Sequence, residues 1–148
     1  MCKDEQYVNI PNNLKFIPLY LSQDIISIVQ KVISASRNCF NYRCDLHNHT
    51  QKHKLRDVKD SVFKYTTIHT ARKTRYANVK QDIYDKWTII VPLSTYFVPY
   101  VRNKVNVTQS VGYISFDTAH DAEDYLKCLR QDWVKLVVHT TRYGNFNN

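Results

Sequence analysis

The chain has 148 residues, of which 43% are hydrophobic and 23% are charged, so it can build one core and is not expected to be disordered throughout. Twenty-one Lys and Arg against 13 Asp and Glu give a net charge of +8. This charge favours a polyanionic partner but does not separate DNA, RNA and an acidic membrane. No apolar run approaches the roughly 20 residues that cross a bilayer, so no membrane-spanning helix is expected.

The N-terminal segment and the cysteines bear on the compartment. Residues 1–5 are charged and lack the apolar stretch of a secretory leader. Cysteines without such a leader are expected to be free thiols in a reducing cytoplasm. The four cysteines are Cys2, Cys39, Cys44 and Cys128.

The first part of the chain predicts one helix followed by an irregular segment. Apolar residues recur at three- and four-residue spacing over Leu19–Ser36, which predicts a helix that starts near Ser22 or Gln23. The periodicity then ends. Because Asn, His, Lys and Arg dominate Arg37–Asp60, this segment is predicted to be a polar loop.

Strand patterns follow, interrupted by a basic segment. Ser61–His69 is rich in β-branched and aromatic residues, which predicts a strand, whereas Thr70–Asp85 is predicted to be a basic loop. The continuous apolar run Trp87–Val91, ended by Pro92, predicts a buried strand. Two further strands are predicted, over Tyr96–Val101 and over Val111–Phe116.

The C-terminal part predicts helical structure again. Thr118 and Asp121 imitate a capping box, so a helix is expected to begin at about Ala119. Its apolar stripe continues to Thr140, and two helices with a bend at residues 131–132 fit as well as one. Gly144 lies where a helix C-terminus would place it.

These elements predict an α+β fold. It has a small mixed or antiparallel sheet, an N-terminal helix and one or two C-terminal helices. We expect a single domain over residues 1–148, in which a helix and a variable polar loop (1–60) precede the strand-rich part (61–148).

Cysteine and histidine, the ligands that zinc prefers, gather within residues 39–53. They are Cys39, Cys44, His47, His49 and His53. Their spacings match neither a zinc finger nor a ribbon, and no second pair of ligands follows. A solvated His-rich loop is therefore favoured, and no metal site is expected.

A nuclease is an alternative hypothesis. Asp45 with Asp57 and Lys59 could hold a metal ion and orient a water molecule, although a D-x-K triplet is frequent by chance. The string HNH at residues 47–49 is a coincidence, because the three residues of the nuclease motif of that name are dispersed over a larger unit.

Motifs for methyl transfer and for phosphate loops are missing. Transfer from S-adenosylmethionine to adenine needs a glycine-containing cofactor loop and an Asn/Asp-Pro-Pro-aromatic motif. The four prolines are never adjacent, and the only glycines are Gly112 and Gly144. Catalysis is therefore expected to come from another polypeptide segment, and this chain is assigned no catalytic residue and no cofactor.

Positive charge is concentrated between Lys52 and Lys86, where ten Lys and Arg against four Asp leave +6 of the total +8. Basic and aromatic residues interleave there, as phosphate neutralisation combined with groove or stacking contacts requires. The residues concerned are Lys64, Arg72, Lys73, Arg75, Tyr76 and Lys80. A solvated basic loop is the alternative interpretation.

An ordered run of motifs gives the second half a family resemblance. The motifs are FKY at 63–65, IHT at 68–70, RY at 75–76, YDKWTIIVP at 84–92, VTQSVGYISF at 107–116, DAEDYL at 121–126 and YGNFNN at 143–148. In this order they resemble the C-terminal target-recognition region of adenine-specific DNA methyltransferases of type II restriction-modification systems. The resemblance begins at Phe63, and Met1–Asp60 corresponds only loosely.

In that family the region reads the target sequence and holds the duplex while a catalytic domain flips out adenine. The resemblance implies a sequence-specific module for double-stranded DNA without its catalytic domain, either a separately encoded subunit or a remnant of a split gene. S-adenosylmethionine would be bound by the missing domain, and a methyltransferase catalytic subunit is the implied protein partner. A protein-interaction subunit without a role on DNA is a further alternative.

The expected DNA contacts combine the basic segment with two residues further along the chain. They are Lys64, Arg72, Lys73, Arg75, Tyr76, Lys80, Arg102 and Asn145. An amide such as that of Asn145 can pair with an adenine edge, although a helix-terminating turn explains it equally well.

Overall fold

The computed structural model describes residues 7–12, 14, 18, 21–35, 41–93 and 96–141. Its contacts group into two compact units, one made of the described residues up to 35 with 132–141, the other of residues 41–131. The single domain expected over the whole chain stays a prediction. Cys2, Cys39, Gly144, Asn145 and the motif at 143–148 lie outside the described residues.

The first unit pairs two helices. Helix α1, Gln23–Ala35, buries Ile26 and Val29 completely, as its apolar spacing predicts. It begins after Ser22, whose hydroxyl accepts a hydrogen bond from the N–H of Ile25 (3.2 Å) and so satisfies one free donor of the first turn. Helix α3, Asp132–Thr141, contacts α1.

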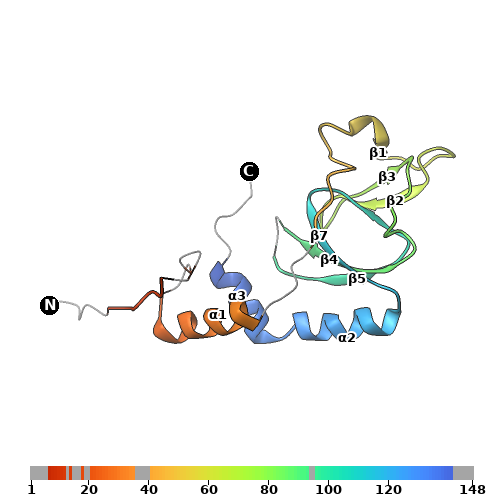
Figure 1. The fold of residues 1–148 in the computed structure, drawn as a ribbon. Helices are drawn as coiled ribbons and strands as arrows, with labels where there is room; N and C mark the ends of the chain where they lie inside the picture. Colours follow the sequence, from red (N-terminus) through yellow and green to blue (C-terminus); the bar gives the residue numbers. More distant parts are fainter. Residues whose placement is uncertain are drawn as a thin grey trace. The chain divides into compact units, whose positions relative to one another are not determined.

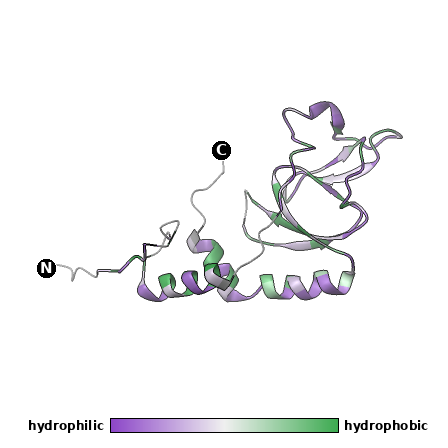
Figure 2. Cartoon of the chain, in the orientation of Figure 1, coloured by the Kyte–Doolittle hydropathy of each residue, from purple (hydrophilic) through white to green (hydrophobic). Residues whose placement is uncertain are grey.

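The second unit contains two sheets and one helix. The strands are β1 (Leu55–Arg56), β2 (Tyr65–Ile68), β3 (Thr74–Ala77), β4 (Trp87–Pro92), β5 (Tyr100–Arg102), β6 (Asn106–Val107) and β7 (Val111–Phe116). One sheet has the order β1-β3-β2-β6 and the other β5-β4-β7. Only the pairing of β2 with β6 is parallel among the described strands. The 3-10 turn η1 (Lys52–Lys54) precedes β1, and Figure 2 shows it as hydrophilic.

The main core of this unit lies between the two sheets. Ile68 and Val107 from the first sheet cluster with Ile90, Val111 and Tyr113 from the second. Burying such side chains contributes roughly 1.5–3 kcal/mol each. Helix α2 (Ala119–Leu129) lies on the other side of β5-β4-β7, away from β1-β3-β2 (Figure 1). The α+β fold, the mixed sheet and the terminal helices are therefore confirmed.

The predicted start of α2 is also confirmed, and of the two alternatives left open for this region the structure has the break into two helices. The N–H of Asp121 donates to the Thr118 hydroxyl (3.1 Å), which in turn donates to the Asp121 carboxylate (2.7 Å). The helix ends at Leu129, and α3 begins at Asp132. Two helices, rather than one, occupy this part of the chain.

Four details of the structure differ from the sequence interpretation. Part of the predicted basic loop 70–85 is strand β3, and the predicted polar loop 37–60 contains β1 and the fully buried Leu46. Strand β5 covers Tyr100–Arg102 rather than Tyr96–Val101, and β6 was not predicted. In β3 a charged residue, Arg75, takes an inward position, so the usual alternation of apolar and polar residues is absent.

Candidate nucleic-acid interface

Strands β2 and β3 form an antiparallel hairpin in the centre of the basic segment. Thr67 lies opposite Arg75, and Ile68 lies opposite Thr74. The connecting loop is held by Thr70, whose hydroxyl accepts from the N–H groups of Arg72 (3.3 Å) and Lys73 (3.0 Å). The N–H of His69 donates to the carbonyl of Lys73 (3.0 Å). The loop is therefore ordered by local hydrogen bonds, and it leaves Arg72 exposed.

The register divides the predicted site residues between two faces of the sheet. Side chains of cross-strand partners point to the same face, whereas successive residues point to opposite faces. Arg56, Tyr76 and Thr66 are register partners across three strands and share one face. Arg75 is adjacent to Tyr76 and therefore lies on the opposite face.

Arg75 is almost buried, with 9% of the residue exposed, and it is held by two partners. One guanidinium nitrogen donates to the side-chain carbonyl of Asn48. Its Nε lies 2.9 Å from an Asp57 oxygen as an ion pair, although the N–H is not aligned for a hydrogen bond. Asn48 is anchored in turn, because its N–H donates to Gln109 Oε1 (3.1 Å). This arginine links three segments of the fold.

His69 lies beside the same cluster. Its Nδ1 is 2.9 Å from the hydroxyl of Thr108, which also donates to the His69 carbonyl (3.3 Å). Burial of the ring, together with the positive charges of Arg75 and Lys73, lowers the pKa of His69 below its ordinary value. The imidazole is therefore neutral at pH 7.

Two further cations of the predicted site have acidic partners. Lys73 lies 3.4 Å from Asp57, and Lys80 forms an ion pair with Asp85. Desolvation raises the pKa of Asp57, but the charges of Arg75 and Lys73 lower it more, so the pKa is below its ordinary value. The carboxylate is thus ionised near neutral pH and reduces the positive field of the cations beside it.

Lys64, Arg72 and Arg102 are exposed, and within the described part of the chain they form no ion pair with an acidic side chain. Aromatic rings support two of them. The Lys64 ammonium lies 5.5 Å from the centre of the Tyr65 ring, and the Arg102 guanidinium lies 5.4 Å from that of Tyr100. These three cations have charges that remain available to a polyanion.

Two buried amides support the hairpin, and sequence reasoning missed both. The side chain of Gln81 accepts from the N–H of Val107 (2.7 Å) and donates to its carbonyl (2.9 Å), as a neighbouring strand would. Asn106 accepts from the N–H of Gln81 (3.0 Å) and donates to the carbonyl of Val79 (2.9 Å). A single amide in a polar segment carries no periodic signal, so the sequence could not reveal these contacts.

The carboxylates of the nuclease hypothesis belong to separate networks. Asp45 accepts from Arg43 (3.0 Å) and from the Gln81 amide (3.0 Å), whereas Asp57 faces Arg75 and Lys73. No group of three or more His, Cys, Asp or Glu in the described ranges is arranged to hold a metal ion. Each carboxylate is compensated by an arginine, which lowers its affinity for a cation.

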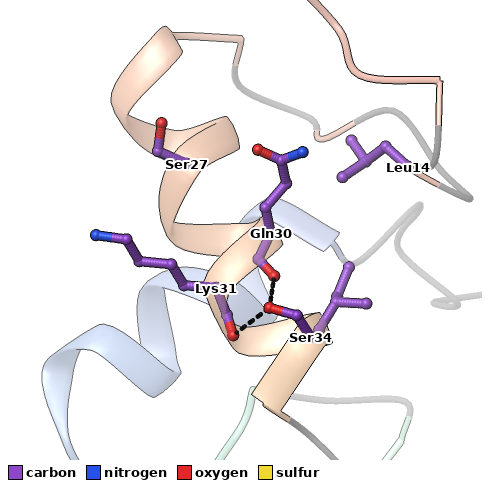
Figure 3. Close-up of a pocket in the computed structure, with 6 residues that line it drawn as sticks. Leu14, Ser27, Gln30, Lys31 and Ser34 are labelled. Carbon is purple, nitrogen blue, oxygen red and sulfur yellow. Dashed lines mark hydrogen bonds between the residues drawn. The ribbon is translucent and has the colours of Figure 1, made fainter.

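A groove of about 470 Å³ lies in the first unit, beside helix α1. Figure 3 shows Leu14 and the α1 residues Ser27, Gln30, Lys31 and Ser34 around it. The hydroxyl of Ser34 donates to the carbonyls of Gln30 (2.7 Å) and Lys31 (3.1 Å), and Ser27 donates within the helix as well (2.9 Å). Both of these serine hydroxyls are therefore hydrogen-bonded within α1.

Comparisons of the chain with known protein families, with curated proteins and with solved structures find no match. No helix in the described part of the chain has the length and apolar character needed to cross a membrane.

Proposed function

We propose that this chain is a sequence-specific DNA-binding module that acts on double-stranded DNA together with a catalytic domain on another chain. The exposed cations around the β2–β3 hairpin carry the proposal. Exposed Lys and Arg neutralise phosphates, and Lys64 precedes β2 while Arg72 lies in the loop that joins β2 to β3. The motif order from Phe63 onward, which resembles a methyltransferase target-recognition region, supports the same function. S-adenosylmethionine would be bound by the catalytic chain.

The proposal divides the predicted contact residues by role. Lys64, Arg72 and Arg102 are exposed without an acidic partner in the described ranges, so we assign them to phosphate contacts. Arg75 is a positioning residue, because its buried guanidinium holds Asn48 and Asp57. Lys73 and Lys80 would reach DNA only in competition with Asp57 and Asp85.

The proposal is tested by measuring duplex binding over a range of salt concentrations. The parent should bind with an affinity that falls steeply with salt, because bound phosphates release their counterions. Replacing Lys64 and Arg72 together by Ala should reduce the slope of log affinity against log salt by about two. Lys127→Ala on α2 is the matched control, since it removes one exposed lysine from another element. Salt-insensitive binding, or no binding, would refute the module.

Sequence specificity requires a separate measurement. Selection of binding sites from random duplexes by the parent chain should yield a preferred sequence. An unselective pool in the presence of strong, salt-dependent binding would reduce the proposal to a non-specific DNA-binding protein.

A second candidate function is a protein-interaction subunit, and one observation favours it. Helices α1 and α3 and the residue Leu21 before them expose Leu21, Ile33, Trp133 and Leu136, of which Trp133 is the most exposed at 52%. Co-purification with a catalytic chain that persists after Trp133→Ala and Leu136→Ala would argue against this surface. A chain that binds DNA on its own would argue against a purely protein-binding role.

A further inference from the structure

Arg56 is a cation that the sequence pattern placed in a polar loop and that no motif singled out. The structure places it on strand β1, opposite Tyr76 of β3, and 63% of its side chain is exposed. It therefore lies in the sheet that contains the hairpin, on the face opposite to Arg75. Its guanidinium also contacts Phe63 and Asp60.

The guanidinium of Arg56 lies over the ring of Phe63, with its central carbon 4.4 Å from the ring centre. Phe63 is itself buried, with 7% exposed, so the ring forms a fixed surface. Stacking occupies a face of the guanidinium, whereas its N–H groups lie in the guanidinium plane. The contact therefore covers a face of the guanidinium, while 63% of the side chain stays exposed.

Asp60 contacts both Arg56 and the backbone of Phe63. One of its carboxylate oxygens accepts from the N–H groups of Val62 (2.8 Å) and Phe63 (2.6 Å), which closes the turn that presents the ring. These backbone hydrogen bonds lower the pKa of Asp60 below its ordinary value, so the carboxylate stays charged. Its other oxygen lies 3.6 Å from Arg56 Nη1, a distance that orients the cation without a short hydrogen bond.

We infer that Arg56 donates two parallel hydrogen bonds to a pair of acceptor atoms on the DNA duplex, and that Phe63 and Asp60 hold it ready to do so. The inference rests on the proposed function. Two groups of the duplex offer such an acceptor pair, the O6/N7 edge of guanine in the major groove and the oxygens of a phosphate. Lysine is a point charge without the planar fork, so it cannot reproduce this contact.

Two variants at position 56 test the inference, with the parent's selected duplex and an unrelated duplex as probes. Arg56→Lys keeps the charge and removes the fork, and it should weaken binding roughly tenfold. Arg56→Met keeps an apolar cover over Phe63 and removes the charge, and it should bind at least as weakly as the Lys variant. Thermal unfolding of each variant confirms that the protein is folded, and Lys127→Ala again serves as the surface control.

A guanine acceptor and a phosphate acceptor predict different losses of affinity in these variants. If guanine is read, the loss for Arg56→Lys is confined to the selected duplex, and a new selection loses its preference for guanine at one position. If a phosphate is bound, both duplexes lose affinity equally, and Arg56→Met lowers the salt slope by about one. Phe63→Leu, which removes the stacking ring, should weaken binding less than Arg56→Met in either case.

The outcomes that would overturn the inference are also distinct. If Arg56→Lys binds as the parent does, Arg56 acts only as a point charge. If Arg56→Met binds as the parent does, Arg56 only covers Phe63. Absence of duplex binding by the parent would overturn the proposed function itself, and this inference with it.

Discussion

Arg56 and Arg75 lie on adjacent strands of one sheet, yet they have opposite environments. Arg75 is 9% exposed and holds Asn48 and Asp57, whereas the side chain of Arg56 is 63% exposed over a phenylalanine ring. The register accounts for the difference, because Arg56 is the partner of Tyr76 and so points away from the Arg75 face. The number of basic residues in a segment therefore overstates the charge that the segment offers to a partner.

The largest difference between the two arginines is expected in stability. Arg75→Leu should lower the free energy of unfolding by about 2 kcal/mol, because the buried arginine loses its hydrogen bond to the partly buried carbonyl of Asn48 and its ion pair with Asp57. Arg56→Leu should lower it by less than about 1 kcal/mol, since the lost contact is at the surface. Urea denaturation of both variants measures these values. Equal losses would show that the two faces do not differ as described.

Asp57→Asn should increase DNA binding, because it removes the carboxylate that neutralises Lys73 and faces Arg75. We expect a several-fold higher affinity for a duplex and a salt slope steeper by up to one. Asp124→Asn is the matched control, because it releases Lys127 in the same way on α2. Weaker binding by Asp57→Asn with an unchanged control would mean that Asp57 acts by holding the loop rather than by reducing its charge.

His69 gives the Arg75 face a dependence on pH. Its folded pKa lies below the ordinary value of 6.5 because of burial and the charges of Arg75 and Lys73, with Asp57 acting in the opposite direction. The unfolded chain therefore binds this proton more readily. The contribution to stability is complete above pH 6.5 and is lost as the pH falls from there toward the folded pKa.

The variant His69→Gln isolates this contribution. Unfolding free energies of the parent and the variant, measured between pH 5 and 8, should run parallel above about pH 6.5 and converge below it. A difference that stays constant over the whole range would exclude His69 as the titrating group.

Lys73→Ala is expected to have the smallest effect. The lysine is about half exposed and lies 3.4 Å from an exposed carboxylate, so its loss should change the free energy of unfolding by less than about 0.5 kcal/mol. It should also weaken DNA binding less than Arg72→Ala does, although the two residues are adjacent in the loop. A larger effect of Lys73→Ala would show that the ion pair between Lys73 and Asp57 breaks when DNA binds.

Strong local patterns explain the parts of the fold that could be predicted. The apolar run of β4 and the strand signal of β7 gave strand bounds that agree with the structure to within one residue. Thr118 gave the start of α2, because its capping contacts are local in sequence. Such elements depend on neighbouring residues, so the sequence alone contains their cause.

The predictions that failed share one physical reason. At these positions, contacts between residues far apart in the sequence determine the structure. Arg75 occupies an inward position of β3 because Asn48 and Asp57 satisfy its charge. Leu46 is one apolar residue in a polar segment, yet it packs with Leu55 and Ala77. The positive charge of the basic segment can be read from the sequence, but the orientation of its members depends on the register, which the sequence does not reveal.

The parallel pairing of β2 with β6 has a consequence for the order of folding. The β2–β3 hairpin is closed by nearby residues, whereas β6 reaches β2 through contacts such as His69 with Thr108, which are 39 positions apart. Local hairpins close in about 1–10 μs, and distant pairings form more slowly because a larger loop must be ordered first. The hairpin that we propose to meet DNA can therefore form early, but it acquires its rigid support only when β6 arrives.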